Sequence, residues 1–324
     1  MLIPDHIFEI KNAEEFESCA LKVFRYQAVH NLVYNKYLQL TGISINQVQQ
    51  IDNIPFMPIS FFKNQKVISG LDEVKLLFQS SGTTQENRSK HYLTNPELYR
   101  KSFTKSYKNY IGNPENQIIV GLLPNYIERG DSSLVYMVNE LIKQTKNAYS
   151  GFILGNNEEV FELNQLALEQ EKQFVLFGVS YSLLDLCEFN KSLQNVWIIE
   201  TGGMKGYRKE IPKEELYLNV NDVLKPTKLF SEYGMTELCS QAYAEEDGIF
   251  RTPNWMKVLI SEVDDPFGHF YKEKRGRINV IDLANYYSCS FIQTDDLGIN
   301  YDDGFQLLGR VQDSDVRGCN QLVV

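Results

Sequence analysis

Long apolar runs and an excess of basic residues are both missing from this 324-residue chain. No stretch of eighteen apolar residues occurs, and residues 1–16 have neither a basic start nor an apolar run of signal-peptide length. We therefore expect a cytoplasmic protein that is not integral to a membrane. The net charge of −10 argues against a nucleic-acid partner, because nucleic-acid binding requires a basic face that displaces counterions.

Cysteine and histidine are scarce, and their spacing excludes the common metal-binding and disulfide patterns. The four histidines show no ligand spacing, and we expect His91 to lie at the surface. The cysteines form no C-x-x-C pair, so neither a zinc site nor a disulfide framework is predicted. They are widely scattered, at Cys19, Cys187, Cys239, Cys289 and Cys319.

Apolar side chains make up 43% of the chain, which is enough for a large core. Because no internal repeat and no Pro/Gly/Ser linker occurs, we predict a single domain over residues 1–324. Apolar residues at three- and four-residue steps predict amphipathic helix over residues 13–41. Strand-like and helix-like segments then alternate, which predicts an α/β core for about residues 1–254.

Three short apolar runs in this core are predicted to be buried strands, at residues 117–123, 174–179 and 196–200. The apolar stripe from Leu134 to Ile142 predicts a helix whose N-cap is Asp131 or Ser132. The pattern then becomes strand-rich, and we predict a β-rich subdomain over residues 255–324. Its expected strands are residues 257–263, 277–283, 291–294 and 306–308.

Three segments carry residues suited to nucleotide chemistry, and the first follows a strand-like run that ends at Gln79. It places hydroxyl residues around a glycine, with cations close behind at Arg88 and Lys90. Backbone N–H groups and hydroxyls in such a loop, completed by a cation, form a cradle for phosphate oxygens. A solvated Ser/Thr loop is the alternative, and the spacing of a P-loop is absent. The loop residues are Ser80, Ser81, Gly82, Thr83 and Thr84.

The second segment is Tyr233-Gly234-Met235-Thr236-Glu237. Within five residues it offers an aromatic face that can stack on adenine, a hydroxyl for phosphate and a carboxylate suited to Mg²⁺. The alternative is a plain strand-to-helix turn in which Glu237 is only a first-turn carboxylate.

The third segment has two parts, residues 294–298 and residues 309–318. We expect the first part to be a turn whose carboxylate, Asp296, accepts hydrogen bonds from ribose hydroxyls. Arg310, just after the next strand, is suited to neutralising phosphate. Either part alone is also compatible with an ordinary acidic β-turn.

In this order and at these separations, the three segments resemble the core motifs of the adenylate-forming superfamily, which includes the acyl-CoA synthetases. The resemblance implies an α/β fold of layered αβα sheets with a β-rich C-terminal subdomain, and it implies ATP and Mg²⁺ as cofactors. The sequence departs from the family motifs at Gln85 and Asp295, where glycine is usual. The resemblance implies phosphate contacts from Ser80–Thr84, from either Lys90 or Arg88, and from Thr236 as a catalytic residue. It implies adenine contact from Tyr233, cofactor binding by Gly234, and a close approach of adenine to the backbone at Gly202 and Gly203. Catalytic Glu237 would bind Mg²⁺, Asp296 would bind ribose, Arg310 would bind ribose or phosphate, and Asp313 would lie at a hinge.

Over nearly its whole length the chain resembles the acyl-protein synthetase (LuxE-type) family, whose members lack the small C-terminal domain of a full superfamily member. The resemblance implies activation of a carboxylic acid, such as a fatty acid, to acyl-AMP. The acyl group then passes to a cysteine near the C-terminus and on to a partner such as a reductase, transferase or carrier protein. Cys319, after Gly318, occupies that position, and Cys239, two residues after Glu237, is the runner-up nucleophile.

Other interpretations of the chain stay open. Cys319 is alternatively a small buried apolar residue in a terminal strand, as free cysteines often are. The enzyme is alternatively an acyl-CoA or acyl-carrier ligase without a covalent enzyme intermediate. From another class, the chain is a non-catalytic subunit that binds an acyl group or a nucleotide.

Overall fold

The computed structural model describes residues 4–80, 88–124, 130–202, 211–245, 247–265 and 268–311. By its internal contacts the chain divides into two compact units, and the predicted boundary near residue 254 stays a prediction. The first unit is Met1–Ser102, Glu237–Ser240 and Ile249–Val324, and the second is Phe103–Thr236 and Gln241–Gly248. None of the helices within the described ranges is both long and apolar enough to cross a membrane.

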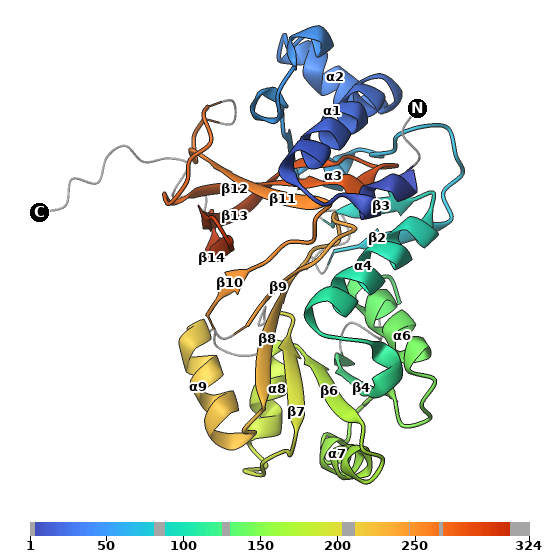
Figure 1. Ribbon diagram of the computed structural model, residues 1–324, viewed down its shortest axis with the longest axis vertical. Helices are drawn as coiled ribbons and strands as arrows, with labels where there is room; N and C mark the ends of the chain where they lie inside the picture. Colours follow the sequence, from blue (N-terminus) through green and yellow to red (C-terminus); the bar gives the residue numbers. More distant parts are fainter. Residues whose placement is uncertain are drawn as a thin grey trace, which may run out of the picture. The chain divides into compact units, whose positions relative to one another are not determined.

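A six-stranded sheet in the order β5-β4-β6-β7-β8-β9 forms the centre of the second unit (Figure 1). Its strands run parallel except for β9, which pairs antiparallel with β8. The three predicted buried strands are confirmed as β4, β6 and β7, whereas β5, β8 and β9 were not predicted. The strands are β4 (Gln117–Leu122), β5 (Gly151–Phe152), β6 (Gln173–Gly178), β7 (Val196–Glu200), β8 (Lys228–Tyr233) and β9 (Ala242–Ala244).

Helices cover both faces of this sheet, which explains why its central strands are almost entirely apolar. On one face, Leu176 of β6 belongs to a buried cluster with side chains of α7 (Glu159–Glu169), α8 (Ser180–Cys187) and α9 (Lys213–Val223). The next residue, Phe177, points to the other face and stacks on Tyr107 at 6.1 Å between ring centroids. The predicted αβα layering is confirmed.

Helix α6 (Ser133–Thr145) forms as its apolar stripe predicts. Ser132 caps it, because the Ser132 hydroxyl accepts a hydrogen bond from the Val135 N–H. Met137, Val138 and Leu141 are fully or almost fully buried, and α6 packs beside β4. Of the two predicted N-caps, Ser132 is therefore the one that the helix uses.

The sheet of the first unit has the order β10-β14-β13-β12-β11, and β1 adds a parallel strand to β13. All other pairs in it are antiparallel. The four strands expected after residue 255 are confirmed as β11 to β14, although β13 is much longer than predicted. The strands are β1 (Met57–Pro58), β10 (Ile249–Phe250), β11 (Met256–Ser261), β12 (Gly276–Asp282), β13 (Phe291–Tyr301) and β14 (Gly304–Arg310).

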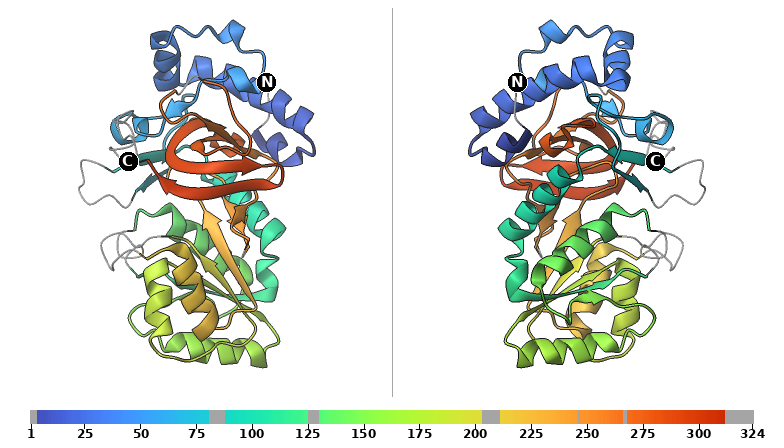
Figure 2. Two further views of the ribbon diagram at one scale, coloured as in Figure 1. Left: turned by 90° about the vertical axis from the view of Figure 1, so that its left-hand side faces the viewer. Right: turned by 90° about the vertical axis from the view of Figure 1, so that its right-hand side faces the viewer.

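Helices α1 (Ala13–His30) and α2 (Leu32–Leu40) lie beside this sheet, and Figure 2 shows them in blue above the orange and red strands. Phe24 of α1 contacts Phe291 of β13 edge to face, at 6.0 Å between centroids. The predicted helix over 13–41 is broken once, because the Asn31 side chain accepts from the Tyr34 N–H and caps α2. The smaller elements are η1 (Pro4–Glu9), η2 (Ile45–Gln47), η3 (Ile51–Asn53), α3 (Phe61–Asn64), β2 (Leu76–Gln79), β3 (Lys90–Leu93), η5 (Pro114–Asn116) and η6 (Leu283–Asn285).

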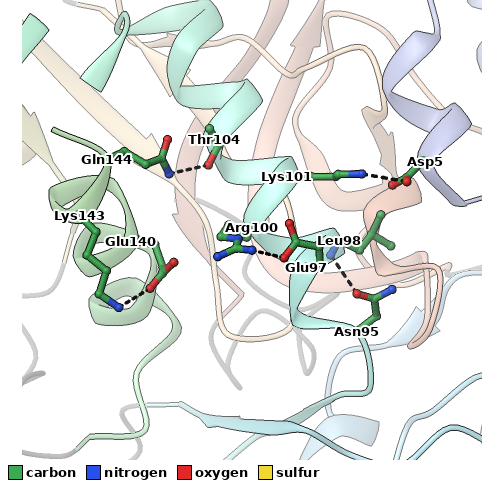
Figure 3. A network of polar contacts seen from close by, with 10 residues as sticks. All are labelled: Asp5, Asn95, Glu97, Leu98, Arg100, Lys101, Thr104, Glu140, Lys143 and Gln144. Atoms are coloured by element: carbon green, nitrogen blue, oxygen red, sulfur yellow. Dashed lines mark hydrogen bonds and ion pairs between the residues drawn. The ribbon is translucent and has the colours of Figure 1, made fainter. Parts of the chain in front are cut away.

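Helix α4 (Pro96–Tyr110) begins after Asn95, whose side-chain oxygen accepts from the Leu98 N–H at 3.2 Å (Figure 3). Within the first unit, Lys101 Nζ lies 2.8 Å from an Asp5 carboxylate oxygen. The second unit holds the later part of α4, where Thr104 accepts from the side-chain amide of Gln144 at 3.0 Å. The Lys101–Asp5 ion pair is largely exposed, so it adds little to stability.

Gly276, at the start of β12, lies against the neighbouring strand, so its substitution tests the packing of the first unit's sheet. A Cβ at this position would lie 2.1 Å from the Ser261 carbonyl oxygen, which is backbone and cannot move alone. We expect Gly276→Ala to lower the free energy of unfolding by about 3 kcal/mol in urea unfolding. Gly151→Ala in β5 is the matched control, since nothing lies within 4 Å of its added Cβ. Equal effects of the two substitutions would contradict this packing.

Candidate functional site

The predicted phosphate loop joins β2 and β3, which pair antiparallel. Hydrogen bonds close its base: the Ser80 N–H donates to the Ser89 carbonyl at 3.0 Å, and the Ser89 N–H donates to the Ser80 hydroxyl at 2.9 Å. Arg88 Nε also donates to the Ser80 carbonyl at 2.7 Å. The other predicted loop residues, Ser81, Gly82, Thr83 and Thr84, lie outside the described part of the chain.

Strand β3 separates the residues after this loop onto two faces. His91 was expected at the surface, but it is almost fully buried, with its ring edge-on to Phe62 at 5.7 Å. The reason is the two-residue alternation of a strand, which turns His91 inward and Lys90 to the opposite face. Whether Lys90 or Arg88 contacts phosphate stays a prediction.

Glu237 is a buried carboxylate, with 6% of the residue exposed. Burial raises the pKa of Glu237, while a hydrogen bond from the Ser89 side chain and the charge of Arg310 lower it. The charge of Asp296 acts in the opposite direction and raises the pKa of Glu237. Glu237 therefore lies within electrostatic reach of one cation and one further carboxylate.

Asp296 and Arg310 face each other on paired strands, with Arg310 Nε 3.0 Å from Asp296 Oδ1. The segment 294–298 was expected to be a turn, and this prediction is wrong, since it lies inside β13. Pairing with β14 keeps it extended, and the chain turns only after Tyr301. The pairing of β13 with β14 is interrupted in this segment by a bulge between Leu297 and Gly298.

The first unit thus brings together residues from all three predicted segments. Ser89 comes from the end of the phosphate loop, Glu237 from the second segment, and Asp296 and Arg310 from the third. We call these four residues the carboxylate cluster. The predicted hinge residue Asp313 lies outside the described residues.

In the second unit, the predicted nucleotide residues lie at the carboxyl ends of parallel strands, the edge where α/β sheets bind ligands. Tyr233 ends β8 and is buried, and Gly234 and Thr236 follow it, both partly exposed. Gly234 packs closely, because an added Cβ would lie 2.2 Å from Glu232 Oε1. Gly202 follows β7, whereas Gly203 lies outside the described ranges.

Sequence reasoning missed a buried carboxylate at this edge, Glu200 at the end of β7. It accepts hydrogen bonds from the Ser180 hydroxyl at 2.6 Å, the Gly202 N–H at 2.7 Å and the Ser231 hydroxyl at 3.0 Å. Glu200 therefore ties the ends of β6, β7 and β8 together and fixes the backbone of Gly202. Nothing in the local pattern distinguishes it, because two of its three partners, Ser180 and Ser231, are twenty and thirty-one residues away.

Glu232 gives a testable pH dependence. Burial, and next the charge of Glu200, raise the pKa of Glu232 to about 8 from an ordinary value of 4.5. Between these values the folded protein binds more protons than the unfolded chain, so rising pH lowers the free energy of unfolding. The side chain is partly exposed. Because solvent screens the charge of a partly exposed carboxylate, we expect the free energy of unfolding to fall by only about 2 kcal/mol between about pH 5 and pH 8.

Urea unfolding across this pH range measures the effect. Glu232→Gln keeps the size of the side chain and removes the titration, so its unfolding free energy should vary less with pH. The same pH dependence in both proteins would contradict this account of Glu232.

The four described cysteines are poor candidates for a nucleophile. Burial is the largest cause that raises the pKa of each thiol, to about 11 for Cys187 and about 12 for Cys289. Cys239, the runner-up, is buried, and the charge of Asp282 raises its pKa further. A thiol held protonated is unsuited to attack on an acyl-adenylate. Cys319, the first candidate, lies outside the described part of the chain.

Comparison with known proteins identifies the family. The family described as "Acyl-protein synthetase, LuxE" matches residues 8–324. Comparison with curated proteins returned no match.

Solved structures of acyl-CoA ligases share the fold. A 2-hydroxyisobutyryl-CoA ligase in complex with 2-HIB-AMP and CoA has a TM-score of 0.67 and 10% identity, over 93% of this chain and 70% of that chain. ATP-bound MatB from Rhodopseudomonas palustris has a TM-score of 0.55 and 16% identity, over 74% of this chain and 49% of that chain. MenE from Bacillus subtilis has a TM-score of 0.52 and 20% identity, over 75% and 50%. The chain thus spans about half the length of MatB and MenE.

These similarities confirm the predicted fold class, and the family match extends over nearly the entire sequence. The chain belongs to the LuxE acyl-protein synthetase family and is an adenylate-forming ligase.

Proposed function

We propose that this enzyme uses ATP to convert a carboxylic acid, specifically a fatty acid, into acyl-AMP. Cys319 then takes the acyl group and delivers it to an acceptor, which is a reductase, a transferase or a carrier protein. The observation that carries the proposal is the carboxylate cluster, in which residues from three distant segments meet. Family membership supports the same chemistry.

The first step joins the substrate to the nucleotide. A carboxylate oxygen attacks the α-phosphorus of ATP, an O–P bond forms, and the bond to pyrophosphate breaks. Because negative charge concentrates around the phosphates, fixed cations and hydrogen-bond donors assist most. Arg310, whose side chain is 61% exposed, is available to a nucleotide, and Asp296 offers an acceptor for ribose. The resemblance to the family motifs adds Tyr233, Gly234 and Gly202 as adenine contacts and Thr236 as a phosphate contact.

The carboxylate cluster fits a magnesium ion. Mg²⁺ takes oxygen ligands, commonly one or two carboxylates together with substrate phosphates. Glu237 would hold the ion, and its raised pKa fits a carboxylate that ionises best beside a bound cation. When bound, the ion would supply charge neutralisation at the phosphates of ATP. No group of three or more His, Cys, Asp or Glu residues suited to a metal occurs among the described residues, so Glu237 and ATP would share the coordination with water.

The second step moves the acyl group to sulfur. The Cys319 thiol loses its proton to solvent, the thiolate attacks the acyl carbon, and the bond to AMP breaks as the thioester forms. Support comes from the family match, from the position of Cys319 near the C-terminus, and from the raised pKa values of the four described cysteines.

ATP–pyrophosphate exchange with a panel of carboxylic acids tests the first step. We expect exchange that requires an added acid and Mg²⁺ and that is fastest with fatty acids. ATP binding without exchange for any acid would contradict the proposal. Formation of free acyl-CoA at the same rate as exchange would identify coenzyme A as the acceptor instead of Cys319.

A further inference from the structure

A buried side chain, Asp282 at the end of β12, holds the turn that carries Glu237 against the rest of the first unit. Asp282 Oδ2 accepts the N–H groups of Cys239 and Ser240, at 2.8 and 2.9 Å. Asp282 Oδ1 accepts the Ser240 hydroxyl at 2.6 Å and the Ala284 N–H at 3.0 Å. All four partners are donors, so the site is built for a carboxylate.

Asn285, three residues later, holds the other end of the same turn. Its side-chain amide donates to the Glu237 carbonyl at 2.8 Å and to the Cys289 carbonyl at 3.1 Å. The segment that bears Asn285 is itself held by α1, because the Gln27 amide donates to the carbonyls of Asn285 and Tyr286, each at 2.9 Å. Asp282 and Asn285 therefore hold residues 237–240 by their backbone.

This arrangement fixes the position of Glu237 without touching its carboxylate. Glu237 has its own carbonyl held by Asn285, and Asp282 holds the N–H groups of the second and third residues after it. With its own carbonyl and the N–H groups of Cys239 and Ser240 held, the Glu237 side chain has a defined origin from which to reach the carboxylate cluster. A small displacement of such a ligand costs much of its benefit, because metal and transition-state contacts depend on position.

We infer that Asp282 is a positioning residue for Glu237, and that Asn285 is a second anchor of the same turn. The inference rests on the proposed function of Glu237 as the residue that holds Mg²⁺ with ATP. Asp282 acts on the adenylation step through the Glu237 backbone, not through the substrate acid.

Asp282→Asn is the direct test, because its amide nitrogen would face donors in place of an acceptor oxygen. The KM for Mg·ATP in pyrophosphate exchange should rise about tenfold or more, as is typical when a partner of a metal ligand is lost. The KM for the carboxylic acid should change less than about twofold, because the substrate acid does not depend on this turn.

Ser102→Ala is the matched control. The Ser102 hydroxyl lies 2.9 Å from the Ser240 hydroxyl and accepts from the Trp255 indole at 2.9 Å, so it joins the same network without holding the turn's backbone. It should leave both KM values unchanged. A similar rise in the KM for Mg·ATP in Ser102→Ala and Asp282→Asn would show a general structural role and overturn the inference.

A double-mutant cycle separates this inference from the proposed function. If Asp282 acts only through Glu237, adding Asp282→Asn to Glu237→Gln should cause no further loss of exchange, whereas independent losses would multiply. Multiplying losses would overturn the inference while leaving the role of Glu237 intact. Full exchange in Glu237→Gln alone would instead remove the role of Glu237. If Asp282→Asn does not fold, Asn285→Ala replaces it in the same cycle. No further loss of exchange would then support the inference, and multiplying losses would overturn it.

Discussion

Replacing Glu237 with glutamine is expected to slow ATP–pyrophosphate exchange about a hundredfold or more, the range found when one fixed electrostatic contact to a transition state is lost. Glutamine keeps the shape of the side chain and a hydrogen-bond acceptor for Ser89. It removes the negative charge that would hold Mg²⁺ beside the phosphates. Steady-state exchange at saturating fatty acid, with Mg²⁺ titrated, measures the effect.

Thermal unfolding of the same variant separates catalysis from stability. Because burial raises the pKa of Glu237, the folded protein holds this charge at a cost, and a neutral glutamine should not lower the melting temperature. Glu9→Gln, at an exposed position of η1, is the control for losing a carboxylate elsewhere in the first unit. A melting temperature low enough to leave the variant unfolded under the assay conditions would show that Glu237 serves the fold.

Replacing Cys319 with serine is expected to abolish the covalent acyl-enzyme completely while leaving pyrophosphate exchange within about twofold of the original enzyme. A serine hydroxyl is far less acidic than a thiol, so without a dedicated base it does not attack the mixed anhydride. Incubation with ATP and a radiolabelled fatty acid, followed by denaturing gel electrophoresis and hydroxylamine treatment, measures the thioester.

Cys19→Ser provides the control for this experiment, because Cys19 is a partly exposed cysteine on α1, in another part of the sequence. It should retain the full hydroxylamine-sensitive label. Label remaining on Cys319→Ser at the original level would show that another residue carries the acyl group. Exchange lost in Cys319→Ser would instead place this residue in the adenylation step.

The regular parts of the fold are predictable because they follow from local patterns. The buried parallel strand at 196–200 coincides with β7, and the apolar stripe after Ser132 coincides with α6. Both elements have one strong period and a clear beginning. The break at Asn31 is less visible, because the apolar pattern continues through the cap from α1 into α2.

The residues that organise the candidate site are set by contacts distant in sequence, which a local pattern does not contain. Thr294–Gly298 has the composition of a turn, yet pairing with β14 keeps it extended. Asp282 sits at the end of an apolar strand, and its partners at Cys239 and Ser240 are about forty residues earlier. The motif residues Glu237, Asp296 and Arg310 were predictable by resemblance, whereas their anchors were not.

The β13–β14 hairpin also limits where foreign sequence can be introduced. Tyr301 and Gly304 face each other across the two residues of its tip, and this count, together with the bulge between Leu297 and Gly298, sets Arg310 opposite Asp296. One residue more or fewer at the tip would turn Arg310 to the other face of its strand. We expect an epitope tag or a circular-permutation site placed there to disturb this pairing and to lower the activity of the enzyme. The exposed stretch around Leu154 and Gly155 lies between β5 and α7, outside any strand pair whose register an insertion would shift. It is therefore the better place for an insertion.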